Sequence, residues 1–513
     1  MIELGLQRIS RLLSKTHLPW RAIHVAGTNG KGSICVYISG MLEAYNDSPS
    51  RLANKQPRIR HGRFTSPHLI DRWDCISINQ KPVSSALFHE IEKKVLLRNA
   101  KEEINASEFE LLTATAFEIF THEKVDIGVI EVGMGGRLDA TNILGQPVES
   151  DASSSEETII RATPLVTAIA KIGLDHQTFL GSTLQAIAAE KAGILKPSVP
   201  LVYDSSNPEE VTNTFQTLAS QIGAPISNLM SLLTTSTPTI PDSTKQSLAH
   251  TLPSQELKSL GLTSEGNTPA HTRQNTSVAL QATLIALQNF LPSTHTHTNN
   301  TTTTTTSPPP FNTLIPTFLS VPSQTTFPGR LQPLNIQTLT NRLTPILLDG
   351  AHNAQSAAVL AEAVAEIRKN SSSSSSSSFS SSSGSSSSKV TWLLAASDSK
   401  DISELLTPLL KPGDAFCAVE FGPVDGMPWV KAMGAEKVAR AAREIVSGGG
   451  SKFGENEEVE DAGKSSGNVF GRDVVGGLKR ASEIAGEGPL VVAGSLYLVG
   501  SVLKALRESR DGE

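Results

Sequence analysis

The sequence is poor in cysteine, in long apolar runs and in excess charge of one sign. Three cysteines (Cys35, Cys75 and Cys417) are spread over 513 residues without a CxxC pair. This spacing excludes a disulfide framework and a cysteine zinc site. No apolar stretch reaches the roughly 20 residues of a membrane span, so we expect no membrane partner. The formal net charge is −6, from 44 basic and 50 acidic residues. It lacks the basic excess of a nucleic-acid binder.

Apolar residues are also scarce for a chain of this length, at 38%. A chain of 513 residues is long enough for two or more domains, so the low value indicates that part of it is not packed core. Three polar tracts account for this, a Thr-rich one at 293–310, a Ser-rich one at 371–388 and a mixed one at 447–468. We predict that they are disordered or surface inserts in a folded protein.

The first 20 residues contain no apolar core of a secretory signal. Their arginines and leucines also occur in mitochondrial transit peptides, but Glu3 argues against that reading. We predict a folded amphipathic helix and a cytoplasmic monomer, with a mitochondrial location left open.

Apolar strands alternate with helical patterns along both halves of the chain. This order predicts an α/β fold in which parallel sheets are covered on both faces. We expect a P-loop-type parallel-sheet ATPase domain at 1–326 and a smaller, Rossmann-like α/β domain at 327–513. The expected strands lie within 21–27, 125–136, 164–176, 344–349, 389–397, 415–421 and 488–494, and the expected helices within 33–45, 109–124, 183–196 and 350–369.

A glycine-rich turn follows the first strand and opens a helix, in the sequence HVAGTNGKGS from His24 to Ser33. Backbone N–H groups and the helix dipole at such a turn attract phosphate. Lys31 adds a full charge, and Ser33 can ligate Mg²⁺. Val25 stands where the Walker motif requires glycine, which argues against a P-loop switch protein. The turn also lacks GxGxxG, which argues against a dinucleotide oxidoreductase.

Several ionisable residues stand where strands end. Glu131, His176, Asp349 and His352 each follow an apolar strand, at the edge where open α/β sheets bind ligands. Each could equally be a satisfied structural residue, and a histidine is an unusual ligand for Mg²⁺. Lys191 lies within a helical pattern, and its position alone favours a solvated lysine.

Taken together, the motifs resemble the folylpolyglutamate synthase and dihydrofolate synthase family of Mur-type ATP-dependent amide ligases. The family order is kept from residue 22 to beyond 350, and the terminal GSLYLVGSVLKAL is also similar to the end of the family. The matching motifs are HVAGTNGKGS, GRFTSPHL, EVGMGGRLDATN, IGLDH, IAAEKAGILK, FPGRLQ and LDGAHN.

The resemblance implies a site residue by residue. It implies catalytic roles for Lys31, Lys191 (as a carbamylated lysine) and His352. The implied metal is Mg²⁺, held by Ser66, Glu131 and His176. The implied contacts of ATP are Gly27, Thr28, Asn29, Gly30, Lys31, Gly32, Ser33, Asn275, Arg330 and Asp349. The implied contacts of the pteridine are Phe109, Leu138, Asp139 and Ala140.

The resemblance further implies a reaction that joins L-glutamate to a pterin-bearing carboxylate through an acyl phosphate. Asn29 favours a dihydrofolate synthase, which acts on dihydropteroate, because eukaryotic polyglutamate synthases more often carry lysine at this position. A folylpolyglutamate synthase or a bifunctional enzyme is the alternative. A non-catalytic nucleotide- or folate-binding protein is a more distant one, since a binder has no need of Lys31, Glu131, His176 and Lys191 together.

Overall fold

The computed structural model describes residues 5–53, 55–146, 161–227, 242–259, 268–291, 313–373, 389–448 and 468–511, with the single residues 229, 232 and 262. The predicted insert at 293–310 and the larger parts of those at 371–388 and 447–468 lie outside these residues. The chain forms two compact units. Unit 1 comprises Met1–His68 and Trp73–Thr325, and unit 2 comprises Leu69–Arg72 and Thr326–Glu513.

Unit 1 is built on a mostly parallel sheet with the order β4-β3-β2-β5-β1-β6-β7. The central strand β1 pairs in parallel with β5 on one side and β6 on the other, and it is buried along almost its whole length. Such apolar strands require cover on both faces of the sheet. The strands are β1 Arg21–Ala26, β2 His61–Phe64, β3 Ile76–Ile78, β4 Lys81–Pro82, β5 Ile127–Glu131, β6 Thr163–Ile169 and β7 Leu201–Tyr203.

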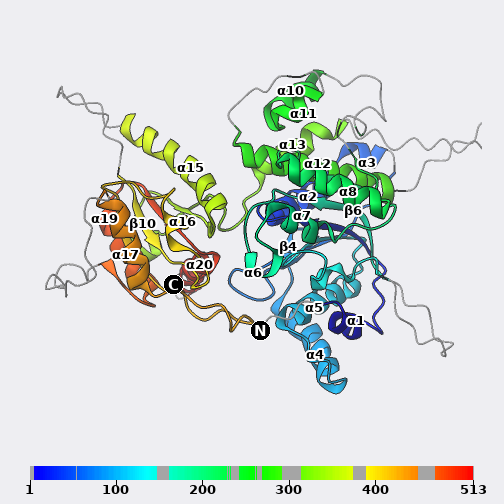
Figure 1. Cartoon of the computed structure of the whole chain (residues 1–513), viewed down its shortest axis with the longest axis horizontal. Helices are drawn as coiled ribbons and strands as arrows, with labels where there is room; N and C mark the ends of the chain where they lie inside the picture. Colours follow the sequence, from blue (N-terminus) through cyan, green and yellow to red (C-terminus); the bar gives the residue numbers. More distant parts are fainter. Residues whose placement is uncertain are drawn as a thin grey trace, which may run out of the picture. The chain divides into compact units, whose positions relative to one another are not determined.

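Helices provide that cover on the two faces of the sheet (Figure 1). On one face α2 (Lys31–Asn46), α12 (Ala270–Phe290) and α13 (Ile315–Gln324) form an apolar core with β1 and β6. On the other face α1 (Gln7–Leu12), α4 (Ser85–Lys101) and α5 (Glu108–His122) share a core with Trp20, whose ring centroid lies 5.1 Å from that of Phe117 in an edge-to-face arrangement. The parallel sheet and its first helix, α1, were both predicted from the sequence, and both are confirmed.

Two details of unit 1 differ from the prediction. The edge of the sheet carries an antiparallel hairpin, β3–β4, turned by Asn79 and Gln80, which both have positive φ. The helix expected over 183–196 is α7 (Leu184–Ala192), and it ends at Gly193 instead of running to Pro197. At Gly193 the backbone lies so close to Arg137 that an added Cβ would be 2.3 Å from the Cβ of Arg137.

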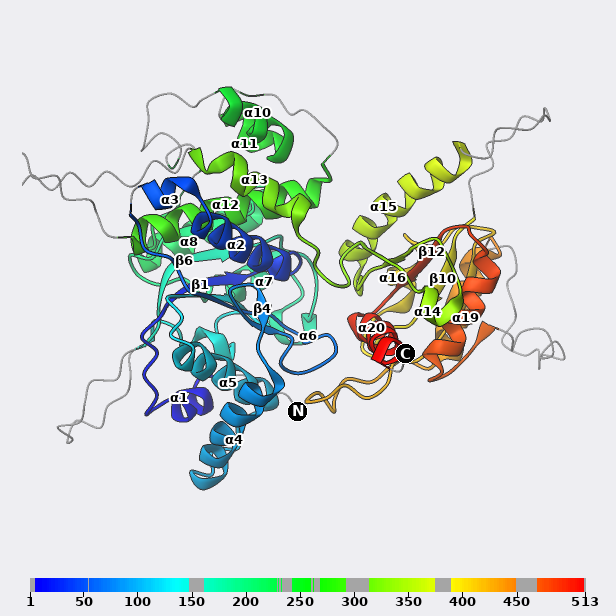
Figure 2. The same ribbon diagram turned by 180° about the vertical axis from the view of Figure 1, so that it is seen from behind.

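Unit 2 is a smaller sheet with the order β11-β10-β12-β9-β8, of which only the edge strand β8 is antiparallel. Its strands are β8 Gln332–Leu334, β9 Ile346–Leu348, β10 Thr391–Leu394, β11 Ala415–Ala418 and β12 Leu490–Ala493. One face is covered by α15 (Ala354–Ser373), α16 (Ile402–Leu406) and α17 (Ala435–Val446), and the other by α19 (Val474–Ala485) and α20 (Leu496–Asp511). Figure 2 shows α19 and α20 with strands β10 and β12 of this unit.

The serine tract begins inside a helix, because α15 continues to Ser373. Over the described ranges, no helix combines the length and the apolar character needed to cross a bilayer. The three cysteines are buried free thiols.

Candidate active site

The glycine-rich turn leads from β1 into α2 with two glycines in conformations that favour glycine. Gly27 has φ 145° and Gly30 has φ 91°, and α2 begins immediately afterwards at Lys31. The Thr28 side chain is held by the segment after β6, since its hydroxyl donates to the Gly173 carbonyl at 3.1 Å. The backbone N–H of Thr28 donates to the Lys171 carbonyl at 2.9 Å. The turn is therefore anchored to the neighbouring strand end, and the first turn of α2 is presented as an anion site.

Asn275 of α12 packs directly against this turn. A Cβ added to Gly30 would lie 2.3 Å from Asn275 Oδ1. The sequence around Asn275 gives little to anchor its alignment with the family. The structure shows that α12 places the Asn275 amide beside the glycine-rich turn. Its role as a nucleotide contact remains a prediction.

Replacing Gly30 by alanine is expected to raise the KM for ATP about tenfold, because the positive φ is strained by about 1–3 kcal/mol and Asn275 must move. The measurement is steady-state kinetics with varied ATP. Gly223→Ala is the matched control, since Gly223 has φ 78° with nothing within 4 Å of an added Cβ. It should lower stability and leave the KM for ATP unchanged. An unchanged KM in Gly30→Ala would contradict the proposed position of the nucleotide.

Glu131 ends β5 beside the phosphate loop. Its Oε2 accepts a hydrogen bond from the backbone N–H of Ser66 at 3.1 Å, and Lys31 Nζ lies 4.0 Å from its Oε1. Lys31 also donates to the Thr28 carbonyl at 3.2 Å. The structure thus brings together three residues predicted from distant motifs, Lys31, Ser66 and Glu131, at the carboxyl edge of the sheet.

The predicted metal ligands are only partly assembled. His176 precedes α6 (Gln177–Leu180), has φ 51°, and its side chain is 45% exposed beside Asp175. Within the described part of the chain, no group of three or more His, Cys, Asp or Glu side chains is placed to hold a metal ion. The carboxylate of Glu131 and the adjacent Ser66 provide the hard oxygen donors that fit Mg²⁺ or Mn²⁺.

Lys191 is not the solvated lysine that its helical position suggests. It is 4% exposed near the end of α7. Burial, and next the charge of Lys31, lower the pKa of its ammonium group to about 7, while Asp175 and Asp139 oppose the shift. An added Cβ on Gly136 would lie 2.7 Å from the Lys191 carbonyl, so this lysine packs against the loop that follows β5. With a pKa of about 7, about half of this buried amine is neutral near pH 7, and a neutral amine is a nucleophile.

Of the predicted pteridine contacts, Leu138, Asp139 and Ala140 follow β5, and Phe109 of α5 packs against the same loop. The ring of Phe109 reaches to within 2.4 Å of where a Cβ on Gly133 would stand, and it stacks on Phe64 with centroids 6.2 Å apart. Asp139 is buried, and both of its carboxylate oxygens accept hydrogen bonds from the loop itself, from Met134 and Thr141. Burial raises its pKa and these hydrogen bonds oppose the rise.

Unit 2 contains the remaining predicted residues. Asp349, which follows β9, accepts hydrogen bonds from the backbone N–H groups of Leu331 at 2.7 Å and Ala351 at 2.8 Å. Burial raises the pKa of Asp349, and the charge of Arg330 opposes that rise. His352 Nδ1 donates to the Gly350 carbonyl at 2.9 Å. Arg330 Nη1 lies 2.6 Å from where a Cβ on Gly350 would stand, so Arg330 also reaches the segment between β9 and α15 that carries Asp349 and His352.

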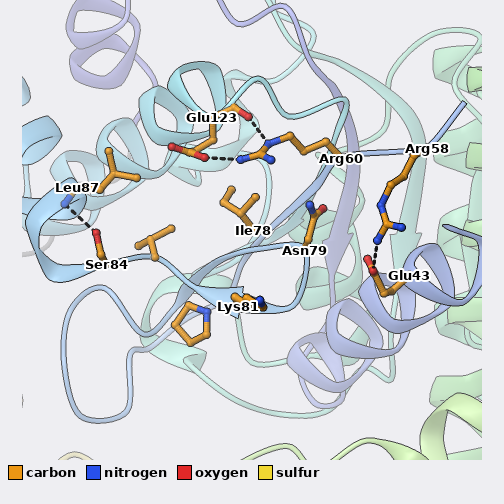
Figure 3. Close-up of a pocket in the computed structure, with 11 residues that line it drawn as sticks. Glu43, Arg58, Arg60, Ile78, Asn79, Lys81, Ser84, Leu87 and Glu123 are labelled. Carbon is orange, nitrogen blue, oxygen red and sulfur yellow. Dashed lines mark hydrogen bonds and ion pairs between the residues drawn. The ribbon is translucent and has the colours of Figure 1, made fainter. Parts of the chain in front are cut away.

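A recess of about 470 Å³ lies elsewhere in unit 1, between the β3–β4 hairpin, the start of α4 and the residues Arg58, Arg60 and Glu123 that precede β2 and β5 (Figure 3). Its guanidinium groups are already paired, Arg58 with Glu43 at 2.5 Å and Arg60 with Glu123. Because it lies at the amino ends of parallel strands whose carboxyl ends carry Glu131 and Ser66, it is separate from the candidate active site.

Some residues of the site region escaped the sequence reasoning. His24, Thr141 and Lys196 are buried polar residues around the loop that follows β5. All three belong to the quoted motifs, but only their contacts reveal what they do.

Comparison with known proteins shows the family to which the chain is similar. The family model described as dihydrofolate synthetase, C-terminal domain, matches residues 332–505. The chain is 31% identical to a probable dihydrofolate synthetase of Schizosaccharomyces pombe, covering 99% of each protein. It is also 31% identical to dihydrofolate synthetase of Saccharomyces cerevisiae, covering 98% of each.

Among solved structures, the bifunctional folylpolyglutamate synthase/dihydrofolate synthase of Yersinia pestis complexed with AMPPNP and Mn ion is similar, with a TM-score of 0.61 and 20% identity. The match covers 99% of this chain and 94% of that one. At this identity it establishes a shared fold, and the α/β fold predicted from the sequence is confirmed.

Proposed function

The chain belongs to the dihydrofolate synthetase family, and from that premise we propose that it joins L-glutamate to dihydropteroate while ATP is converted to ADP and phosphate. The observation that carries the proposal is the assembly of Lys31, Glu131 and Ser66 at the carboxyl edge of the sheet, with Lys191 buried nearby. A protein that only binds a nucleotide has no use for a buried amine of lowered pKa in the same region.

The chemistry has two steps. A carboxylate oxygen of dihydropteroate attacks the γ-phosphorus of ATP, ADP leaves, and an acyl phosphate forms. The amine of glutamate then attacks the carbonyl carbon, inorganic phosphate leaves, and the nitrogen loses a proton. Both steps bring anions together, so fixed positive charge aimed at the phosphates lowers the barrier.

In this chain the phosphates would bind the N–H groups at the start of α2, and Lys31 would neutralise charge on them. A divalent metal, which we propose to be Mg²⁺ held by Ser66, Glu131 and His176, would supply further charge neutralisation when bound. Asn275 would contact the nucleotide over Gly30. The family resemblance also implies nucleotide contacts for Arg330 and Asp349 and a catalytic role for His352.

We also propose that Lys191 is carbamylated. Its neutral amine would attack CO₂, form an N–C bond and release a proton, which leaves a carboxylate on the lysine. The buried position and the pKa of about 7 make the neutral amine available under ordinary conditions. The product would be an anion close to Lys31 and would suit the environment better than the buried cation does.

Carbamylation of Lys191 should increase as pH rises through about 7, because the neutral fraction of an amine grows about tenfold per pH unit below its pKa. Protein freed of CO₂ and then given ¹³C-bicarbonate should show a carbamate carbonyl signal by NMR at pH 8 and a much weaker one at pH 6. Lys191→Met should lack the signal at both values. A signal of equal strength in that variant would assign the modification to another amine.

The activity itself is tested with purified protein, MgATP and L-glutamate, supplied with dihydropteroate in one reaction and tetrahydrofolate in another. Phosphate release and new amide product only with dihydropteroate are expected. Extension of tetrahydrofolate as well would show a bifunctional enzyme, and extension of tetrahydrofolate alone would show a folylpolyglutamate synthase. No product in either reaction, with ATP binding retained, would overturn the proposal in favour of a binding protein.

A further inference from the structure

A buried histidine, His24, contacts the loop that follows β5. His24 lies on β1, three residues before Gly27, and is 0% exposed. Its Nε2 is 2.9 Å from Thr141 Oγ1. Thr141 Oγ1 is in turn 2.6 Å from Asp139 Oδ1. The three side chains form a continuous hydrogen-bonded line from the central strand to the loop.

The direction of each hydrogen bond follows from the number of protons available. A carboxylate only accepts, so the single hydroxyl proton of Thr141 goes to Asp139. The other bond of that hydroxyl must then be donated by His24, which fixes the histidine as the tautomer with the proton on Nε2. Its Nδ1 has no hydrogen-bond partner within the described residues. Burial, and next the charge of Lys196, lower the pKa of His24 to about 3, so the ring stays neutral.

Asp139 passes this constraint to the rest of the loop. Its Oδ1 also accepts from the backbone N–H of Thr141 at 3.0 Å, and its Oδ2 accepts from that of Met134 at 2.8 Å. The carboxylate therefore ties the start of the loop, beside Gly133, to its end. Gly133 is the residue against which the ring of Phe109 packs.

A second buried contact fixes the far end of the loop. Lys196 Nζ donates to Asn142 Oδ1 at 2.6 Å, and Asn142 Nδ2 donates to the carbonyls of Arg137 and Gly193, each at 3.0 Å. The segment from Arg137 to Asn142 is thus held at both ends by buried polar groups, and Leu138 and Ala140 stand between them. Of these buried contacts, the hydrogen bonds from His24 through Thr141 are the ones that reach the Asp139 carboxylate.

We propose that His24 is a positioning residue for the pterin-bearing substrate, acting through Thr141 on the carboxylate of Asp139. The inference rests on the proposed function, which gives this loop its substrate. An apolar side chain would fill the space under the loop without leaving a buried nitrogen unpaired, and an unpaired buried polar atom is unfavourable. The Nδ1 of His24, unpaired within the described residues, is therefore unfavourable for stability. We infer that the histidine is useful because its Nε2 donates to Thr141 and so helps to orient the carboxylate of Asp139.

The test compares two disruptive variants with two conservative variants of the same residues in the full-length protein. His24→Leu and Thr141→Val break the line, whereas His24→Gln and Thr141→Ser keep a donor and a hydroxyl. We expect the KM for dihydropteroate to rise about tenfold in His24→Leu and in Thr141→Val. Leaving a buried polar group without its partner costs about 1–3 kcal/mol, and about 1.4 kcal/mol corresponds to a factor of ten. The KM for ATP should change less than twofold, and the second two variants should recover most of the loss. Thr283→Val is the matched control, a buried threonine of α12 whose hydroxyl donates to the Ala279 carbonyl.

A double variant separates positioning from simple loss of stability. If His24 acts through Thr141, His24→Leu with Thr141→Val should raise the KM no more than either change alone. Additive effects, or a lowered melting temperature with an unchanged KM for dihydropteroate, would overturn the proposal. If the wild-type protein makes no product from dihydropteroate, the proposed function fails first. Direct binding of dihydropteroate to the same variants, followed by protein fluorescence, then decides the role of His24 independently.

Discussion

Replacing Lys191 by alanine is expected to lower turnover by about 10- to 100-fold, with a much smaller change in the KM for ATP. The magnitude is that of removing a group that orients a metal ligand or the metal itself. The side chain of Lys191 is almost fully buried, and the charges of Lys31, Asp175 and Asp139 act on it. Solvent therefore cannot readily replace the charge that is lost with this side chain. The measurement is kcat for phosphate release with saturating dihydropteroate, glutamate and MgATP.

The controls for this prediction distinguish the lost anion from a lost side chain. Lys191→Met keeps the length of the side chain but cannot be carbamylated, so it should be as slow as the alanine variant. Added formate or acetate should restore part of the activity of Lys191→Ala, because a small carboxylate can enter the vacated volume. Lys245→Ala removes an exposed lysine of the same unit and should leave turnover unchanged. Wild-type turnover in Lys191→Ala would exclude any role for the lysine in the reaction.

The strands and the placement of the site could be predicted because both follow from short-range pattern. Apolar runs such as 21–27 and 125–136 are buried on both faces, and their carboxyl ends meet at one edge, so Glu131 and the glycine-rich turn had to be neighbours. The hairpin β3–β4 was missed because strands of three and two residues carry almost no periodic signal.

The missing parts of the site depend on contacts between distant segments. Asn275 lies 245 positions after Gly30, and nothing local to α12 shows that its amide rests on the phosphate loop. Lys191 was ambiguous for the same reason, since helical spacing says which residues share a face but not what covers that face. The end of α7 at Gly193 was also not predicted, and the close approach of Arg137 to Gly193 is a contact between distant segments.

Replacing Asp414 by alanine is expected to destabilise unit 2 by about 3–5 kcal/mol, the range for breaking a buried ion pair. Asp414 precedes β11, and its carboxylate is 1% exposed. It accepts hydrogen bonds from Nη1 and Nη2 of Arg368 on α15 and from the indole N–H of Trp392 at 3.1 Å. The backbone N–H groups of Val390 and Lys411 also donate to it. Truncation would remove the acceptor that all of these donors share.

The loss should be measured by urea unfolding of the whole protein, followed by circular dichroism and by the fluorescence of its four tryptophans. Because two units can unfold separately, a single transition is not assumed, and only the transition of unit 2 is expected to move. Asp414→Asn retains an acceptor oxygen and should lose less. Asp401→Ala, which removes the N-cap of α16 in the same unit, should cost only about 1 kcal/mol. Equal losses in Asp414→Ala and Asp401→Ala would show that the buried ion pair contributes no more than a surface cap. A larger loss at Asp414 would instead identify it as the point where α15, β10 and β11 are joined.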